Sequence, residues 1–141
     1  MEYFSENLKE TQEIGKNLAE EIKKRRIFII KGDLGAGKTT LVQGFAKGLG
    51  ITQKVNSPTF ILMNKYPLKK NKFLYHLDLY RINKKKELES LDIKELINNK
   101  NNIVIIEWPE KIKDILPKDT VCIEMKVLEE NKRKIIIKYG E

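Results

Sequence analysis

The stretch IFIIKGDLGAGKT, residues 27–39, decides the fold of this chain. It opens with four consecutive apolar residues, which is the pattern of a β-strand buried on both faces. Residues 32–39 then fit G-x-x-x-x-G-K-[ST] at every position, which is the pattern of a phosphate-binding loop. Helical periodicity follows over residues 38–49 and ends at Gly50. A strand, a glycine-rich loop and a helix in this order supply the context that such a loop requires.

The residue types in the loop suit a triphosphate. Glycines let successive backbone N–H groups turn inward toward phosphate oxygens, and the start of the following helix adds free amides and a positive dipole end. Lys38 has the length and charge to reach the β- and γ-phosphates, and the Thr39 hydroxyl is a ligand for Mg²⁺. The loop therefore predicts the binding of a nucleoside triphosphate with Mg²⁺. The residues expected to hold it are Gly35, Ala36, Gly37, Lys38, Thr39 and Thr40.

Two carboxylates follow strand-like segments further along the chain. Glu107 comes directly after the apolar run at residues 103–106, and Asp78 ends another strand-like run. On parallel strands both would lie at the carboxyl edge of the sheet, where the phosphate loop also opens. We expect Glu107 to hold the metal or a water as a Walker B acid, and Asp78 to reach the same metal. With Lys38 they form the expected catalytic set; a surface carboxylate at a strand end is the alternative for each.

The rest of the chain alternates between helical and strand patterns. This alternation predicts one α/β domain over residues 1–141, a P-loop NTPase-like three-layer sandwich with a mainly parallel central sheet and a C-terminal antiparallel hairpin. The N-terminal helix would be capped by Asn7 and Glu10. The expected helices are 7–24, 38–49 and 87–97, and the expected strands are 27–30, 59–66, 72–79, 103–106, 120–127 and 133–139.

Length and composition exclude several classes of protein. A chain of 141 residues fits one domain, and its single cysteine excludes an internal disulfide. No apolar run approaches the roughly 18 residues that a membrane span needs. Residues 1–6 are acidic and polar, which is the reverse of a signal peptide. We therefore expect a cytoplasmic protein with no membrane contact.

The net charge of +8 is a poor argument for nucleic-acid binding. Of the 28 basic residues, 24 are lysine and four are arginine, and arginine is the better residue for bidentate phosphate and base contacts. Lysine, asparagine and isoleucine, which have A- and T-rich codons, together supply 54 of the 141 residues. A skewed genome explains this charge without selection for polyanions. We expect no DNA partner; a weak electrostatic attraction to RNA stays open.

Three kinds of P-loop protein compete. A GTPase carries Asn-Lys-x-Asp, but no Asn-Lys pair in this sequence is followed by aspartate at the required position. A small-molecule kinase usually needs a lid with several arginines, and four arginines in the whole chain make such a lid hard to build. An ATPase that uses hydrolysis to change the state of a partner protein needs fewer functional groups, and the residues here match that smaller set. A nucleotide-gated binding module with incidental turnover stays open, as does the kinase.

Three further residues have two readings each, and a fourth is expected to be structural. Arg81 is either a cation for the developing phosphate charge or a structural ion pair, and Thr59 is either a γ-phosphate sensor or part of a proline turn. Trp108 is either a packing anchor or a nucleotide contact. His76, the single histidine, is expected to be packed or hydrogen-bonded in a structural role.

Four motifs in register resemble one family. GDLGAGKTT at 32–40, SPTF at 57–60, HLDLYR at 76–81 and EWPE at 107–110 occur in the order and spacing of the TsaE family, formerly YjeE. These proteins are bacterial ATPases required for threonylcarbamoyladenosine (t6A) modification of tRNA. The resemblance covers nearly the whole chain and implies an ATP-binding and hydrolysing subunit that works with TsaD and TsaB and meets tRNA only indirectly. We expect weak, Mg²⁺-dependent hydrolysis in isolation.

The resemblance also implies roles for particular residues. Thr39 and Glu107 would serve the metal and Asp78 would support hydrolysis, while Thr11 and Arg133 match positions that border the adenine. The sequence departs from the family pattern at two places. Asp92 stands where many relatives have glycine, which affects the expectation for local helix geometry, and Asn56 replaces the commoner Ser or Thr before the Ser-Pro-Thr segment.

Overall fold

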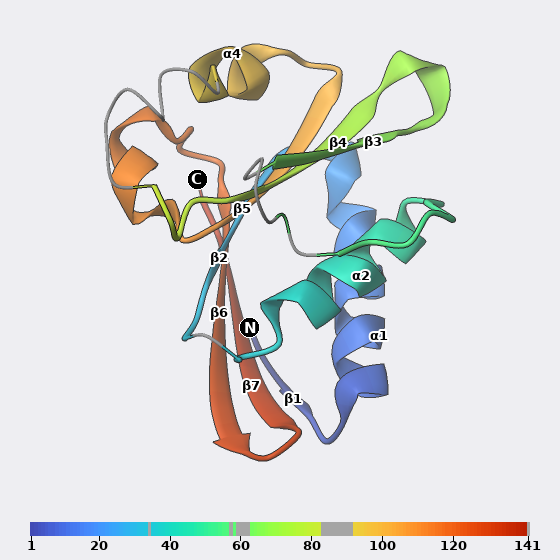
Figure 1. Cartoon of the computed structure of the whole chain (residues 1–141), viewed down its shortest axis with the longest axis vertical. Coiled ribbons are helices and arrows are strands. Elements are labelled where there is room, and N and C mark those ends of the chain that lie inside the picture. The colour runs from blue at the N-terminus through green and yellow to red at the C-terminus, as the bar shows by residue number, and fades with distance from the viewer. Residues whose placement is uncertain (34, 57, 59–62, 83–91, 141) are drawn as a thin grey trace.

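The computed structural model describes residues 1–33, 35–56, 58, 63–82 and 92–140, and these form one seven-stranded sheet with helices (Figure 1). The strands are β1 (Glu2–Ser5), β2 (Ile27–Lys31), β3 (Met63–Pro67), β4 (Phe73–Asp78), β5 (Asn102–Glu107), β6 (Val121–Glu129) and β7 (Lys132–Tyr139). The α-helices are α1 (Leu8–Leu18), α2 (Lys38–Gly48) and α4 (Ile93–Asn98). The 3₁₀ segments are η1 (Ala19–Lys23), η2 (Lys69–Asn71) and η3 (Pro109–Ile115). In these described residues no helix is long and apolar enough to cross a bilayer.

The sheet has a parallel centre and antiparallel edges. Its strand order is β1-β7-β6-β2-β5-β4-β3, and the four central strands β6, β2, β5 and β4 run parallel to one another. The antiparallel partners lie outside them: β3 beside β4, and β7 and then β1 beside β6. This arrangement confirms the predicted α/β class, the parallel core and the C-terminal antiparallel hairpin.

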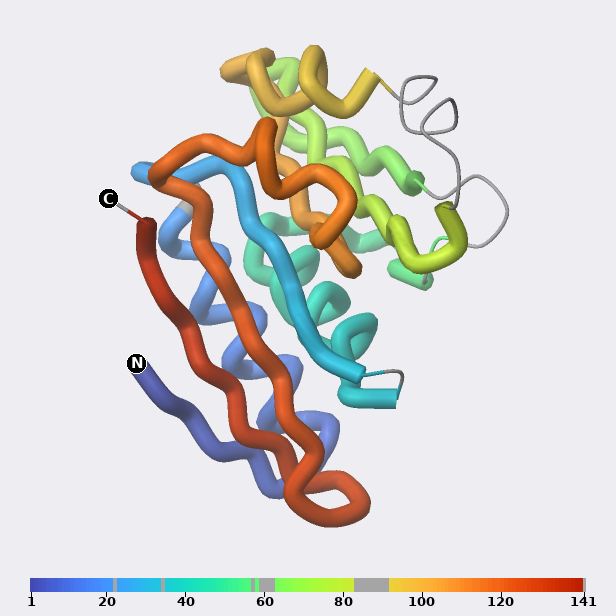
Figure 2. Tube along the Cα trace, turned by 90° about the vertical axis from the view of Figure 1, so that its left-hand side faces the viewer, coloured from blue at the N-terminus to red at the C-terminus, as the bar shows by residue number. Residues whose placement is uncertain are grey.

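Both faces of β2 are buried, which explains its unbroken apolar sequence. Phe28 and Ile30 point into the core that α1 and α2 cover, and Ile27 and Ile29 point into the opposite core with residues of α4 and η3. Because successive side chains of a strand point to opposite faces, a strand between two helical layers needs apolar residues at every position. Figure 2 shows α1 and α2 lying together behind the sheet.

Several predicted boundaries shift. The predicted helix 7–24 is an α-helix only to Leu18 and continues as the 3₁₀ segment η1. Its cap is as predicted, because the Glu10 backbone N–H donates to Asn7 Oδ1 at 2.9 Å. Strand β1 was not predicted, since it has only four residues and shows no clear alternation of apolar and polar side chains. The beginnings of the predicted strand 59–66 and helix 87–97 lie outside the described residues, and within them β3 begins at Met63 and α4 at Ile93.

Asp92 adopts the backbone that a glycine would supply. It precedes α4 with φ of 48°, in the left-handed region. Asparagine and aspartate enter this region more readily than other non-glycine residues. The departure from the family's glycine therefore leaves the left-handed conformation in place.

Glycines allow α1 and α2 to approach closely, and this contact supports the start of α2. A Cβ atom on Gly44 would lie 2.0 Å from the carbonyl oxygen of Gln12, and one on Gly15 would lie 2.2 Å from that of Leu41. Neither backbone oxygen can move away without separating the helices.

We expect Gly44→Ala to lower the free energy of unfolding by about 1–3 kcal/mol, because the added methyl group overpacks this crossing. In an isolated helix the same change stabilises by up to about 1 kcal/mol, so the sign of the change is diagnostic. Denaturant unfolding monitored by circular dichroism measures it. An unchanged or higher stability would contradict the close approach of the two helices.

Candidate active site

A cavity of about 330 Å³ opens at the carboxyl edge of the central strands, beside the glycine-rich loop. A larger hollow of about 430 Å³ lies beside α1, α2 and residues 51–55, but its wall contains no carboxylate. Chemistry rather than size therefore identifies the site. The residues that line the cavity at the loop are Leu8, Gly35, Ala36, Gly37, Lys38, Thr39, Thr40, Asp78, Glu107, Trp108 and Arg133.

The loop depends on glycine at two positions. Gly35 has φ of 80° and Gly37 has φ of 94°, both in the left-handed region that other residues enter at a cost. Gly37 is also the residue before α2, so the first-turn amides of that helix begin at the cavity wall. An anion here meets the positive end of the helix dipole.

Lys38 lies in the cavity wall, and its ammonium group is hydrogen-bonded to the loop. Its side chain is buried, and Nζ donates to the carbonyl oxygens of Gly32 at 2.5 Å and Asp33 at 3.1 Å. Burial lowers the pKa of Lys38, while the negative charges of Glu107 and Asp78 act in the opposite direction. The ammonium therefore occupies a poorly solvated place in which a phosphate oxygen would be a stronger partner than a neutral carbonyl.

Asp78 and Glu107 lie side by side at the ends of two adjacent parallel strands. They are register partners on β4 and β5, and Glu107 is buried while Asp78 is half-buried. Burial raises the pKa of Asp78, and the charge of Glu107 raises it further. The backbone N–H of Tyr80 donates to Asp78 Oδ1 at 3.0 Å, and this hydrogen bond lowers the pKa. Two carboxylates this close together favour a cation between them.

The repulsion between the carboxylates of Asp78 and Glu107 predicts that Asp78→Asn stabilises the protein in the absence of nucleotide and metal. Asparagine keeps the acceptor for Tyr80 but removes a desolvated charge beside Glu107, and we expect the melting temperature at pH 7 to rise by about 1–4 °C. The wild-type protein loses stability as pH rises through the raised pKa of Asp78, and the variant lacks this loss. The difference therefore shrinks at acid pH. Thermal unfolding of both proteins at several pH values with EDTA tests this; a lower melting temperature of the variant at pH 7 would refute it.

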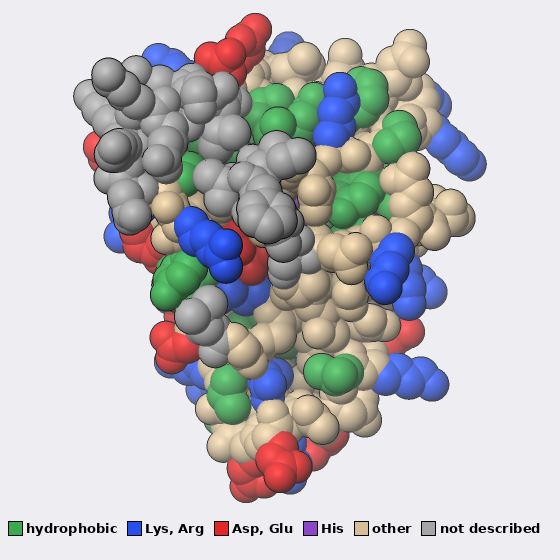
Figure 3. Space-filling view, viewed as in Figure 1, with side chains coloured by type: hydrophobic (Ala, Val, Ile, Leu, Met, Phe, Trp, Pro, Cys, Tyr) green, Lys and Arg blue, Asp and Glu red, His purple; other side chains and the backbone are tan. Residues whose placement is uncertain are grey.

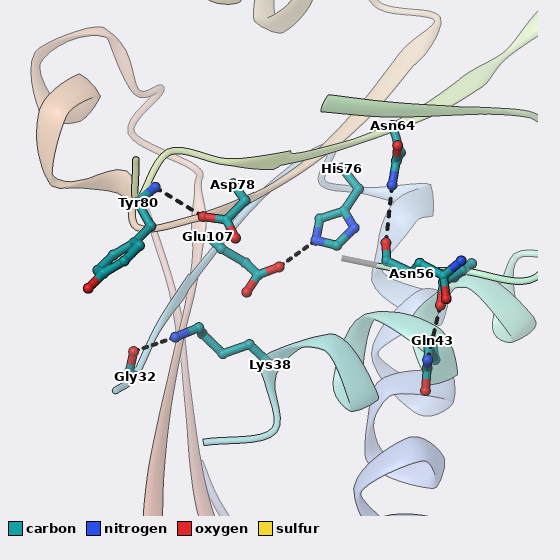
Figure 4. A network of polar contacts seen from close by, with 10 residues as sticks. Gly32, Lys38, Gln43, Asn56, Asn64, His76, Asp78, Tyr80 and Glu107 are labelled. Carbon is teal, nitrogen blue, oxygen red and sulfur yellow. Dashed lines mark hydrogen bonds and ion pairs between the residues drawn. The ribbon is translucent and has the colours of Figure 1, made fainter. Parts of the chain in front are cut away.

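His76 completes the group of polar residues under the loop (Figure 4). Its Nε2 lies 2.6 Å from Glu107 Oε2, and both side chains are buried. The hydrogen-bonded role expected of His76 is thus present. Its partner could not be named from the sequence, because the two residues lie on different strands and meet only through the sheet register.

Arg133 lines the cavity and is tied to the loop. Its Nε donates to the carbonyl oxygen of Ala36 at 2.8 Å and one Nη to that of Gly35 at 3.3 Å, while the other Nη donates to the backbone carbonyl oxygen of Glu130 at 2.6 Å. Buried and bound in this way, Arg133 links the turn between β6 and β7 to the phosphate loop. The guanidinium therefore fixes the shape of the loop.

Thr11 does not line the cavity. It is buried, and its hydroxyl lies 2.7 Å from Ser5 Oγ, which joins α1 to β1. Leu8, one turn earlier in α1, lines the cavity instead and is half exposed. Sequence reasoning missed Leu8, because its place in the cavity wall depends on how α1 packs beside the loop and leaves no local signal.

Trp108 forms part of the wall in a left-handed backbone conformation, with φ of 57°. Its ring centroid lies 4.2 Å from Lys38 Nζ and 4.7 Å from the centroid of the Tyr80 ring. Trp108 therefore packs against Tyr80 and the loop lysine, and its contact with a nucleotide stays a prediction. Arg81 is exposed and does not line the cavity. Thr59 lies outside the described residues.

The donor set fits Mg²⁺. Within the described ranges no three His, Cys, Asp or Glu side chains cluster as a metal site, so the wall does not form a complete protein cage. It instead offers the carboxylates of Asp78 and Glu107 and the hydroxyl of Thr39. Mg²⁺ typically takes one or two carboxylates from the protein and completes its shell with water and phosphate oxygens.

A central strand, a phosphate loop, a helix and an acid at the end of the neighbouring strand define the class of P-loop proteins. Comparison with known proteins gives the family. The family model described as threonylcarbamoyl adenosine biosynthesis protein TsaE matches residues 5–135. The chain belongs to the TsaE family, whose role is t6A modification of tRNA.

Individual relatives agree with this assignment. The chain is 44% identical to the tRNA threonylcarbamoyladenosine biosynthesis protein TsaE of Synechocystis over 115 residues, which cover 79% of this chain and 72% of that protein. It is 38% identical to the Bacillus subtilis protein of the same name over 134 residues, 92% of this chain and 79% of that one. The crystal structure of Bacillus subtilis YdiB superposes with a TM-score of 0.79 at 29% identity, over 100% of this chain and 86% of that chain.

Proposed function

We propose that this chain is the ATP-binding and hydrolysing subunit of the machinery that forms t6A on tRNA. The observation that carries the proposal is the meeting of Lys38, Asp78 and Glu107 in one cavity beside a phosphate loop. A cation, two carboxylates and a helix N-terminus around one space are the parts that phosphoryl transfer to water requires.

Each residue has a task in the proposed reaction. Lys38 leaves the loop carbonyls for the β- and γ-phosphates, and the first amides of α2 bind the same oxygens. Thr39, Glu107 and Asp78 would hold Mg²⁺, which would supply positive charge to balance that of the phosphates. Glu107 also orients the attacking water, because its carboxylate lies at the edge of the sheet where the triphosphate ends.

The adenine end of the site is proposed on the resemblance to the family. Arg133 lines the cavity but gives its described hydrogen bonds to backbone carbonyls, so it holds the loop against which the nucleotide lies. Leu8 supplies an apolar surface for the base. Thr11 acts indirectly, since its hydroxyl on Ser5 fixes α1 against β1 and so positions Leu8.

The positions of the arginines favour an ATPase over a small-molecule kinase. Arg25 donates to the carbonyl oxygens of Asp119 and Gly140, and Arg26 to those of Ile97 and others. Arg133 is bound to the loop. Only Arg81 is left for a phosphoryl-clamping lid, which normally needs several arginines.

The same shortage predicts that the isolated chain hydrolyses ATP slowly. TsaD and TsaB, the partners that the family implies, would complete the site or order Arg81 in it, as an arginine finger does. We expect steady-state phosphate release to rise by more than about tenfold when both proteins are added, and co-purification with them to depend on ATP. Full activity of the chain alone would contradict the need for partners. Phosphorylated product in place of free phosphate would favour a kinase.

A further inference from the structure

The structure contains a contact that the proposed chemistry does not use. His76 is fully buried, and its Nε2 lies 2.6 Å from Oε2 of the buried Glu107. Figure 4 shows the second oxygen of the Glu107 carboxylate directed toward Lys38. One carboxylate oxygen is therefore bound within the protein, and the other faces the cavity.

The sheet register creates this contact. His76 lies two residues before Asp78 on β4 and is the register partner of Ile105, two residues before Glu107 on β5. Residues two apart on a strand share a face, so the imidazole lies one layer deeper in the sheet than the two carboxylates. From β4 the ring reaches diagonally to Glu107 on the neighbouring strand β5.

The surroundings of the ring determine which nitrogen carries the proton. Among the described residues, no hydrogen-bond partner reaches the buried Nδ1 atom of His76. A neutral ring with its proton on Nδ1 would place two acceptors 2.6 Å apart. The nitrogen at this contact therefore carries a proton, and the Nε2–H donates to Glu107 Oε2.

We propose that His76 is a positioning residue that fixes the Glu107 carboxylate for ATP hydrolysis. The Nε2–H holds Oε2, which prevents rotation of the carboxylate and keeps the other oxygen directed at the metal and the attacking water. Histidine suits this task because a rigid ring reaches across one strand spacing and carries a single donor at its tip. The inference rests on the proposed ATPase activity and adds a residue that does not itself touch the nucleotide.

The tautomer can be observed directly, because the chain contains one histidine. Two-dimensional ¹⁵N–¹H correlation spectra of the wild-type protein at pH 7, without nucleotide, report which ring nitrogen is protonated. We expect a proton on Nε2, protected from exchange. A proton on Nδ1 alone, or a rapidly averaging mixture, would overturn the proposal. This measurement does not depend on any enzymatic activity.

Three variants then separate positioning from packing, assayed with TsaB and TsaD present. His76→Leu removes the donor, and we expect kcat for ATP hydrolysis to fall by about 10- to 100-fold, the usual effect of removing an outer-shell partner, with the Kd for ATP within about twofold. His76→Gln retains an N–H donor and is expected to recover most of that loss. Ile105→Val trims the apolar register partner of His76 as a packing control, and should lower stability without changing kcat.

The kinetic outcomes are decisive in either direction. A kcat of His76→Leu within twofold of wild type, or an equal loss in His76→Gln, would overturn the positioning role. Should His76→Leu fail to fold, the comparison of His76→Gln with Ile105→Val and the ¹⁵N spectrum still decide it. A wild-type protein that hydrolyses no ATP with its partners would instead refute the proposed function, while the spectrum would still report the His76–Glu107 contact.

Discussion

Replacing Lys38 with alanine is expected to weaken ATP binding by about 10- to 100-fold, which corresponds to the loss of one charge-assisted hydrogen-bonded contact. The ammonium lies in the cavity wall, buried and bound only to neutral carbonyls and the face of an indole among the described residues. The triphosphate would offer it full negative charges in the same poorly solvated space. Isothermal titration with a non-hydrolysable ATP analogue measures the change.

Lys47→Ala is the matched control for this experiment. Lys47 lies in the last turn of the same helix and is exposed, so its removal changes the net charge equally without touching the cavity. If Lys38→Ala binds the analogue as tightly as Lys47→Ala does, the phosphate loop has been wrongly assigned and the proposed function fails with it.

Replacing Glu107 with glutamine is expected to lower kcat by about 100-fold or more, the typical contribution of a positioned acid–base group, with little change in ATP affinity. Glutamine preserves the shape and the contact with His76 but removes the charge that serves Mg²⁺ and the water. Because the phosphates are held mainly by the loop, binding should survive. Phosphate release in the presence of TsaB and TsaD, with affinity measured in parallel, separates the two effects.

Glu124→Gln controls for loss of a carboxylate elsewhere on the sheet, since Glu124 lies on β6 outside the cavity. Turnover of Glu107→Gln equal to that of this control would exclude Glu107 from the chemistry. The alternative function makes a different prediction. A Glu107 variant that binds ATP without hydrolysing it would then still support full tRNA modification over many cycles. The chain would then be a nucleotide-gated binding module.

The site was predictable from the sequence where its geometry is local. The phosphate loop is contiguous, so spacing alone defines it, and Glu107 was found because an apolar run leads directly to it. Asp78 was placed beside it by the general rule that parallel strands end at one edge. Contacts that depend on register or on tertiary packing were beyond such reasoning. These include His76 on Glu107, Arg133 on the loop, and Leu8 in the cavity wall.

The fold shows the same division. Strand β2 and the terminal hairpin have strong apolar patterns and were predicted nearly to the residue. Strand β1 has four residues at the sheet edge, of which Phe4 is largely exposed, and an edge strand that buries so little has no pattern to detect. Its pairing with β7 is therefore a consequence of the assembled sheet.

The position of Trp108 makes the intrinsic fluorescence of the protein a reporter of the cavity. The chain has a single tryptophan, and its indole lies over the ammonium of Lys38, whose electric field shifts the energy of the excited state. Every ligand that draws this cation toward a phosphate will alter the emission. Occupancy can then be followed in real time, without a dye and in the presence of any companion protein that lacks tryptophan.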